Sequence, residues 1–264
     1  MRCTVLGGQG FIGSHLARHL ETLDFEVYLP AREELVSLSG PLGHVFYCIG
    51  LTADFRSRPF ATVDAHVSML ANIVQRADFE SFTYLSSTRV YARALTARED
   101  SVLGVAPQDP SDLYNLSKLM GEALCLCSGR QGVKVARLSN VLGIGMGADN
   151  FVGGLLKEAR GGRIRLRSHV DSVKDYVLVD DAVRVLARIA CEGRERIYNV
   201  ASGAQIAHGE WLSLLQRETN CVLETDPHAP LQNFPPIDTG RLNAEFNIEP
   251  GFDVATLPNL IKMW

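Results

Sequence analysis

The feature of the sequence that most restricts the fold is the glycine-rich stretch GGQGFIG at residues 7–13. The residues before it, RCTVL, form a short apolar and β-branched run that is typical of a buried strand, and FIGSHLARHLETL repeats apolar side chains at helical spacing. Gly7, Gly10 and Gly13 therefore occupy a strand-to-helix turn. Glycines in such a turn allow a tight bend and let a pyrophosphate approach the free N–H groups of the helix. The stretch predicts a phosphate-binding turn.

The residues after the second predicted strand, in FEVYLPAREEL, bear on which dinucleotide this turn would bind. A carboxylate about twenty residues beyond the glycines binds the ribose 2′-hydroxyl of NAD. This chain instead has Ala31 and Arg32 there, and a guanidinium forms charge-assisted bonds to a 2′-phosphate. The pattern therefore favours NADP(H), with NAD as the alternative. The other interpretation of Arg32 is a surface ion pair with Glu33 or Glu34.

Two later segments carry residues that are suited to proton transfer. The run FTYLSSTRVYAR is rich in strand-forming residues around Ser87 and Thr88, and DPSDLYNLSKLMGEALCL indicates a helix entered through Pro, Asp and Ser. In that helix Tyr114 and Lys118 lie four positions apart and share a face. A neighbouring ammonium lowers the pKa of a tyrosine phenol from about 10, which makes the phenol a usable acid or base.

Composition limits the classes of partner and predicts the surroundings of the protein. The 264 residues carry a net charge of −4, which gives no general attraction to nucleic acid or to an anionic membrane. No apolar run is long enough to span a bilayer, and the first residues lack the pattern of a secretory signal, so we expect a cytoplasmic protein. The six cysteines form no CxxC pair, and we expect neither a disulfide framework nor a metal site.

The order of these segments resembles that of the extended short-chain dehydrogenase/reductases, the superfamily of NAD(P)-dependent nucleotide-sugar epimerases, dehydratases and reductases. GGQGFIG is similar to the cofactor loop, YLSSTRVY to the strand with the catalytic serine or threonine, and YNLSK to the YxxxK pair. VARLSNVLG, KDYVLVDDAV, IYNVASG and IDTGRLNAEFNIEP resemble later segments of the family in the same order, so that the resemblance covers nearly the whole chain.

The resemblance implies a role for each matching residue. It implies Tyr114 as acid/base, Lys118 as the group that tunes the tyrosine pKa and anchors ribose, and Ser87 as hydrogen-bond donor to the reacting oxygen, with Thr88 as the fallback. The expected cofactor-binding residues are Gly7, Gly10, Phe11, Ile12, Gly13, Arg32, Tyr114 and Lys118. The expected substrate-binding residues are Thr88, Asn140, Asn150, Lys174 and Arg241, with the alternating Arg163, Arg165 and Arg167 as further candidates for phosphate.

The chain departs from the family pattern at three informative positions. His66 replaces an asparagine on the cofactor side, and Lys174 replaces an arginine, which would make its contact with phosphate point-like instead of forked. Thr88 and Arg89 stand where the sugar 4,6-dehydratases carry an Asp-Glu pair, which disfavours dehydration.

Strands that alternate with helical segments predict an α/β fold with a parallel sheet covered on both faces. The resemblance implies a Rossmann-type doubly wound sheet in residues 1–141, completed by about 175–201, and a smaller interleaved substrate lobe in residues 142–174 and 202–264. It further implies an NADP(H)-dependent oxidoreductase that reduces a 4-keto group on a nucleotide-linked sugar. The alternatives are an NAD-dependent 4-epimerase and a catalytically silent dinucleotide-binding sensor. A homodimer is expected, because the family often dimerises through the YxxxK helix.

Overall fold

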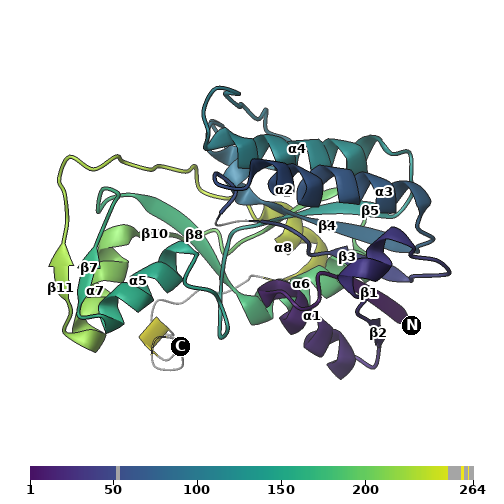
Figure 1. Ribbon diagram of the computed structural model, residues 1–264, viewed down its shortest axis with the longest axis horizontal. Coiled ribbons are helices and arrows are strands. Elements are labelled where there is room, and N and C mark those ends of the chain that lie inside the picture. Colours follow the sequence, from purple (N-terminus) through teal and green to yellow (C-terminus); the bar gives the residue numbers. More distant parts are fainter. Residues whose placement is uncertain (52–53, 249–256, 259–260, 262–264) are drawn as a thin grey trace.

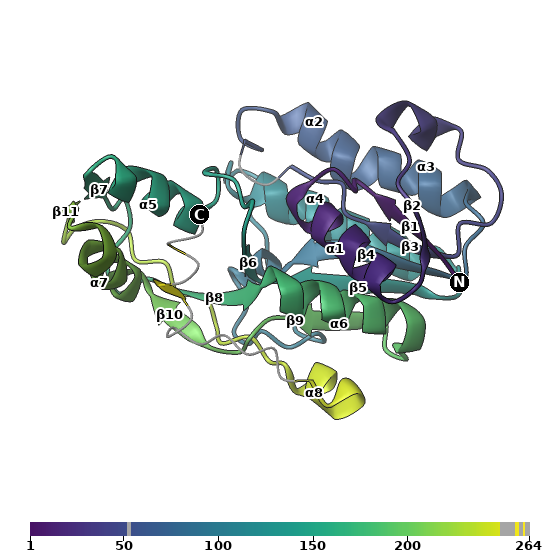
Figure 2. The same cartoon turned by 90° about the horizontal axis from the view of Figure 1, so that it is seen from below.

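The protein folds into two lobes that lie side by side along the longest axis of the molecule (Figure 1). The structure is a computed structural model, which describes residues 1–51, 54–248, 257–258 and 261. The large lobe is a sheet with helices on both faces, and the small lobe holds short strands and helices (Figures 1 and 2). The predicted α/β fold with a smaller interleaved lobe is confirmed.

The large sheet is parallel throughout and has the strand order β2-β1-β3-β4-β5-β9. Its strands are β1 (Arg2–Leu6), β2 (Glu26–Tyr28), β3 (His44–Tyr47), β4 (Ser81–Ser87), β5 (Val133–Leu138) and β9 (Ile197–Val200). The chain runs from β1 to β2 on one side and then starts the other side with β3. Ligands of such sheets bind at the carboxyl ends of the strands beside this reversal of order.

Helices cover both faces of this sheet, which is why its central strands are almost wholly buried. On one face lie α1 (Phe11–Thr22) and α6 (Val179–Glu192); on the other lie α2 (Pro59–Val63), the π-helical turn η2 (Asp64–Ser68), α3 (Met69–Arg76) and α4 (Asp112–Cys127) (Figure 1). Each face has its own apolar core, and the link from β2 to β3 is only the 3₁₀ turn η1 (Arg32–Val36) and short loops.

The small lobe is built on an apolar core of its own, the small-lobe core, which includes Trp211 and Tyr176. A three-stranded sheet has the order β10-β8-β6, with β6 (Asn140–Leu142), β8 (Val173–Leu178) and β10 (Gln205–Ala207). A separate two-stranded sheet pairs β7 (Arg163–Arg165) with β11 (Val222–Glu224). The helices of this lobe include α5 (Phe151–Arg160) and α7 (His208–Thr219). Among the residues that the structure describes, no helix combines the length and the apolar character that crossing a bilayer requires.

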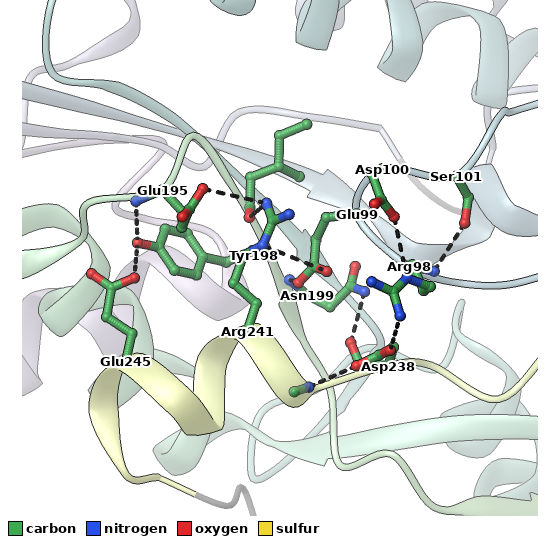
Figure 3. Close-up of polar contacts among 12 residues, drawn as sticks. Arg98, Glu99, Asp100, Ser101, Glu195, Tyr198, Asn199, Asp238, Arg241 and Glu245 are labelled. Carbon is green, nitrogen blue, oxygen red and sulfur yellow. Dashed lines mark hydrogen bonds and ion pairs between the residues drawn. The ribbon is translucent and has the colours of Figure 1, made fainter.

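Helix α8 (Gly240–Phe246) brings the chain back from the small lobe to the large sheet, where it packs against β9. Polar contacts fix it there. Tyr198 Oη donates to Glu245 Oε2 at 2.7 Å (Figure 3), and Glu245 Oε1 accepts from the N–H of Arg194 at 2.7 Å. The Asn199 amide donates to the carbonyl oxygens of Ala97 and Asp238 at 3.0 and 2.9 Å. The last part of the motif IDTGRLNAEFNIEP, Glu249 and Pro250, lies outside the described residues.

Candidate active site

The glycine-rich turn between β1 and α1 forms a cradle that side chains would fill. Gly7 has φ +83°, a conformation that favours glycine, and the N–H of Gly10 donates to its carbonyl oxygen at 3.0 Å. A Cβ on Gly13 would overlap that same carbonyl oxygen. The N–H groups of the first turn of α1, which include those of Phe11 and Ile12, have no partner within the helix. This geometry fits the pyrophosphate of a dinucleotide.

Arg32 lies exposed at the start of η1, four positions beyond the end of β2. Glu34 is engaged locally, because its carboxylate accepts from the N–H of Ala31 at 2.6 Å and from Tyr28 Oη at 3.2 Å. In the described part of the chain, neither Glu33 nor Glu34 forms an ion pair with Arg32 within 4.0 Å. The guanidinium of Arg32 is therefore free to meet a ligand near the end of β2.

The structure brings Ser87, Tyr114 and Lys118 together at the carboxyl end of β4. Ser87 is the last residue of β4 and precedes the 3₁₀ turn η3 (Thr88–Tyr91), whose Arg89 N–H donates to its hydroxyl at 3.2 Å. Tyr114 and Lys118 are each 5% exposed on α4, which packs against β4. Lys118 Nζ donates to the carbonyl oxygen of Leu85 at 2.9 Å and lies 5.9 Å from the ring centroid of Tyr114.

The electrostatics of Tyr114 bear on the prediction that Lys118 lowers its pKa. Burial raises the pKa of the Tyr114 phenol above its ordinary value, opposed by a hydrogen bond with the Ser87 side chain and by the charge of Arg89. Burial also lowers the pKa of Lys118 to about 8, opposed by Glu122. The ammonium of Lys118 is directed at a backbone carbonyl, and the guanidinium of Arg89 faces the ring of Tyr114, so the lowering of this pKa by Lys118 stays a prediction.

His66 joins the loop after β3 to the helix that carries Tyr114. The N–H of Leu51 donates to His66 Nε2 at 3.1 Å, so the ring proton lies on Nδ1, which donates to Ser117 Oγ at 2.8 Å. Ser117 Oγ in turn donates to the carbonyl oxygen of Tyr114 at 2.8 Å. Burial lowers the pKa of His66 to about 2, and the charge of Lys118 adds to this effect. The imidazole of His66 is thus a neutral bridge between the two segments.

Replacing His66 with Ala should lower the free energy of unfolding by roughly 2–4 kcal/mol, because it leaves a cavity and an unpaired N–H at Leu51. Urea unfolding would measure the loss, with Ser68→Ala in the same turn as a control. In the unfolded chain the His66 imidazole takes up a proton as the pH falls below 6.5. In the folded protein it stays neutral until the pH approaches its lowered pKa of about 2. Wild type therefore loses stability as pH falls through this window, and the variant loses less. Equal acid sensitivity of both proteins would contradict the neutral bridge.

A cavity of about 320 Å³ opens in the small lobe and is lined in part by Asn150, Lys174 and His208. Lys174 Nζ lies 4.6 Å from the ring centroid of Phe151, on which His208 stacks at 4.1 Å. Burial, helped by the charge of Arg89, lowers the pKa of Lys174 to about 8. Burial likewise lowers the pKa of His208 to about 4, helped by Lys174. The cavity therefore presents a partly desolvated cation to any ligand that enters it.

The other predicted substrate residues are distributed unevenly around this cavity. Arg165 and Arg167 line it, whereas Arg163 forms an ion pair with Glu224 at 2.8 Å. Asn150 Oδ1 also caps α5 by accepting from the N–H of Gly153 at 2.7 Å. Two further predicted residues make local contacts outside the lining: the amide of Asn140 donates to the carbonyl oxygen of Asp175 at 2.8 Å, and Thr88 is buried in η3.

Arg241 does not join these residues. It lies on α8, donates to the carbonyl oxygen of Ile197 at 2.9 Å and pairs with Glu99 and Glu195 at 3.9 and 3.8 Å (Figure 3). These contacts fasten α8 to β9 and leave the guanidinium outside the cavity lining, so a substrate role for Arg241 stays a prediction. His208 and Phe151, which do line the cavity, carry no motif signal in the sequence.

A comparison with protein families gives one match, which covers residues 3–201 and has the description NAD dependent epimerase/dehydratase family. The matched range includes the glycine turn, Ser87, Tyr114, Lys118 and Lys174. No curated protein matches the sequence significantly.

Solved structures show the same fold at low sequence identity. RMD from Pseudomonas aeruginosa, complexed with NADPH, is 24% identical with a TM-score of 0.80, over 99% of this chain and 97% of that one. MoeE5, in complex with UDP-glucose and NAD, is 21% identical with a TM-score of 0.83, and the match covers 100% of this chain and 98% of that one. The UDP-glucose 4-epimerase of Thermus thermophilus, in complex with NAD, is 19% identical with a TM-score of 0.78, and the match covers 100% of this chain and 98% of that one.

Proposed function

Because the chain belongs to the NAD-dependent epimerase/dehydratase family, we propose that it is an NADP(H)-dependent enzyme that reduces a 4-keto group on a nucleotide-linked sugar. The observation that carries this proposal is the meeting of Ser87, Tyr114 and Lys118 at the end of β4. We assign dinucleotide binding to residues 1–141 with 175–201, and substrate binding to the rest of the chain.

The residues of the site divide the chemistry among them. When bound, the nicotinamide supplies the hydride for the carbonyl carbon. Tyr114 gives its phenolic proton to the oxygen that becomes an alkoxide, and Ser87 donates a hydrogen bond to the same oxygen. Lys118 offers N–H donors to a ribose hydroxyl. The charge of Arg89 opposes the rise of the Tyr114 pKa that burial causes, and so favours release of that proton.

The choice of NADPH over NADH rests on Arg32, and the Arg32→Ala variant tests it. We expect NADPH to bind the variant roughly 10- to 100-fold more weakly, because a charge-assisted contact to the 2′-phosphate is lost. NADH binding should stay unchanged. Fluorescence titration with both dinucleotides measures the two constants, and Arg18→Ala, an exposed change on α1, is the control.

The 4-epimerase makes the opposite prediction for the same titration. An epimerase of this kind keeps NAD bound through its reaction, so NAD would copurify with the protein and Arg32 would have no effect on the affinity for either dinucleotide. That result would replace the reductase with the epimerase, since both would use Ser87, Tyr114 and Lys118.

We also propose that the protein is a homodimer. An apolar groove of about 510 Å³ runs along the outer faces of α3 and α4 and supports this proposal. Met120 in this groove is 53% exposed. The groove is lined by Ala71, Val74, Gln75, Met120, Ala123, Leu124, Cys127, Ser128 and Arg130. The expected cytoplasmic location stays a prediction from the sequence.

A further inference from the structure

Arg89 is a half-buried cation beside Tyr114, and no carboxylate of the described residues pairs with it. It lies in η3, two residues after Ser87, with Cζ 5.3 Å from the ring centroid of Phe55 and 5.8 Å from that of Tyr114. Its Nε is shielded from solvent and has no hydrogen-bond partner. Within the described ranges, no carboxylate lies within the 4.0 Å of an ion pair with its guanidinium.

The acidic groups that act on Arg89 from a distance are both bound by another arginine. Asp112 and Asp109 raise the pKa of Arg89 weakly, against the larger effects of burial and of Arg56. Arg93 holds both carboxylates, with Nε 2.7 Å from Asp112 Oδ2 and Nη2 2.7 Å from Asp109 Oδ2. Arg93 offsets only one of these two negative charges, so Arg56, Arg89 and Arg93 together carry three positive charges against the two carboxylates. The excess positive charge is left to be balanced by something that enters the site.

Arg56 and Lys174 both contribute to the local excess of positive charge. Arg56 lies with Cζ 4.5 Å from the ring centroid of Phe55 and bonds the neutral Ser111 hydroxyl at 3.0 Å. Lys174 is close enough for its charge to be felt at Arg89, and it has no ion-pair partner within 4.0 Å among the described residues. Buried positive charge without a partner is unfavourable, and a bound anion relieves it.

Arg89 and Lys174 occupy different places along the path of a bound substrate. Lys174 lines the cavity of the small lobe together with Asn150 and His208, which suits the diphosphate of a nucleotide sugar. Arg89 instead lies against the ring of Tyr114, whose hydroxyl would face the reacting carbon of the sugar. A guanidinium at that place meets substituents of the sugar ring, and its fork matches the two oxygens of a carboxylate.

We propose that Arg89 binds a carboxylate carried by the sugar itself, so that the preferred substrate is a nucleotide-linked uronic acid or a similar carboxylated sugar. This assignment rests on the proposed function, because it takes the sugar to lie beside Tyr114. It gives a role to the reversed charge at the position where the dehydratases carry an acid.

A matched pair of ligands tests the assignment on the protein loaded with its dinucleotide. UDP-glucuronate and UDP-glucose share base and diphosphate and differ in the carboxylate alone, so the ratio of their dissociation constants isolates the contact with Arg89. Calorimetric titration of wild type should show UDP-glucuronate binding roughly 10- to 100-fold more tightly, as a charge-assisted bond would give. Arg89→Met keeps an unbranched apolar stem and should abolish this preference, while Arg89→Lys should keep part of it.

The control variant is Lys174→Met, which should weaken the binding of both ligands by the same factor and preserve the ratio of their dissociation constants. Unchanged binding of the dinucleotide and an unchanged melting temperature would show that Arg89→Met is folded. Equal binding of the two ligands by wild type, or equal losses for both in Arg89→Met, would overturn the carboxylate assignment and leave the proposed function standing. If neither ligand nor UDP bound to wild type, the proposed function would fail together with it.

Discussion

Replacing Tyr114 with Phe is expected to lower kcat by about 10²- to 10⁴-fold, the range typical of losing a positioned acid or base. The ring should stay in place, because its neighbours Phe55 and His66 contact it through ring faces and edges, each with centroids 5.4 Å away. Binding of the dinucleotide should therefore persist. Oxidation of the reduced nicotinamide in the presence of a 4-keto nucleotide sugar measures turnover, and fluorescence titration measures binding.

Tyr198→Phe provides the matched control, since it removes the same hydroxyl from a buried tyrosine on β9 that bonds Glu245 of α8. Its turnover should equal that of wild type. If Tyr114→Phe kept its turnover as well, the phenol would not be the acid/base. The catalytically silent sensor would then become the better account of the chain.

The largest expected effect on stability comes from the ion pair buried between α4 and β5. Glu122 and Arg137 have side chains that are each 4% exposed, with Nη2 2.7 Å from Oε2 and Nε 3.0 Å from Oε1. Ser86 Oγ also donates to Glu122 at 2.5 Å, and Arg137 donates to Tyr91 Oη at 2.7 Å. Glu122→Gln should lower the free energy of unfolding by roughly 3–5 kcal/mol, because the guanidinium stays buried without its counter-charge.

Urea unfolding measures this loss as a lower midpoint at an unchanged slope. A surface pair supplies the comparison: Glu192→Gln removes the partner of Arg188, 2.7 Å away on α6, where the two side chains are 52% and 38% exposed, and should change stability by less than about 1 kcal/mol. The double variant Glu122→Leu with Arg137→Met should regain much of the loss, since it removes both charges. A loss in Glu122→Gln no larger than that in Glu192→Gln would show that the buried pair contributes little.

The elements that the sequence predicted well are those specified by local patterns. The strand, turn and helix around Gly7 and Gly13 follow from residue types that are neighbours in the chain, and the structure confirms them. The helix with Tyr114 and Lys118 is also confirmed, and its spacing does place both residues beside β4. The passage from Ala31 to His44 holds one 3₁₀ turn, which the sequence analysis did not predict.

What sequence reasoning could not supply depends on contacts between distant segments. Arg241 finds Glu99 and Glu195 only after α8 has packed on β9, and no local pattern distinguishes such an arginine from one that binds phosphate. The pKa of Tyr114 depends on burial and on Arg89, neither of which the spacing of Lys118 reveals. Arg89 was noticed as a departure from a motif, but its lack of a counter-ion is a property of the folded chain.

The path of the chain between the lobes limits how the specificity of this protein can be exchanged with that of a relative. The chain leaves the large sheet after β5, returns with α6, leaves again after β9 and returns with α8. Leu257 and Ile261 then belong once more to the small-lobe core. The small lobe is therefore not one continuous segment that could be exchanged by joining the chain at two points. A chimaera would need matched junctions at every crossing, whereas single changes at Arg89 or Lys174 leave the crossings untouched.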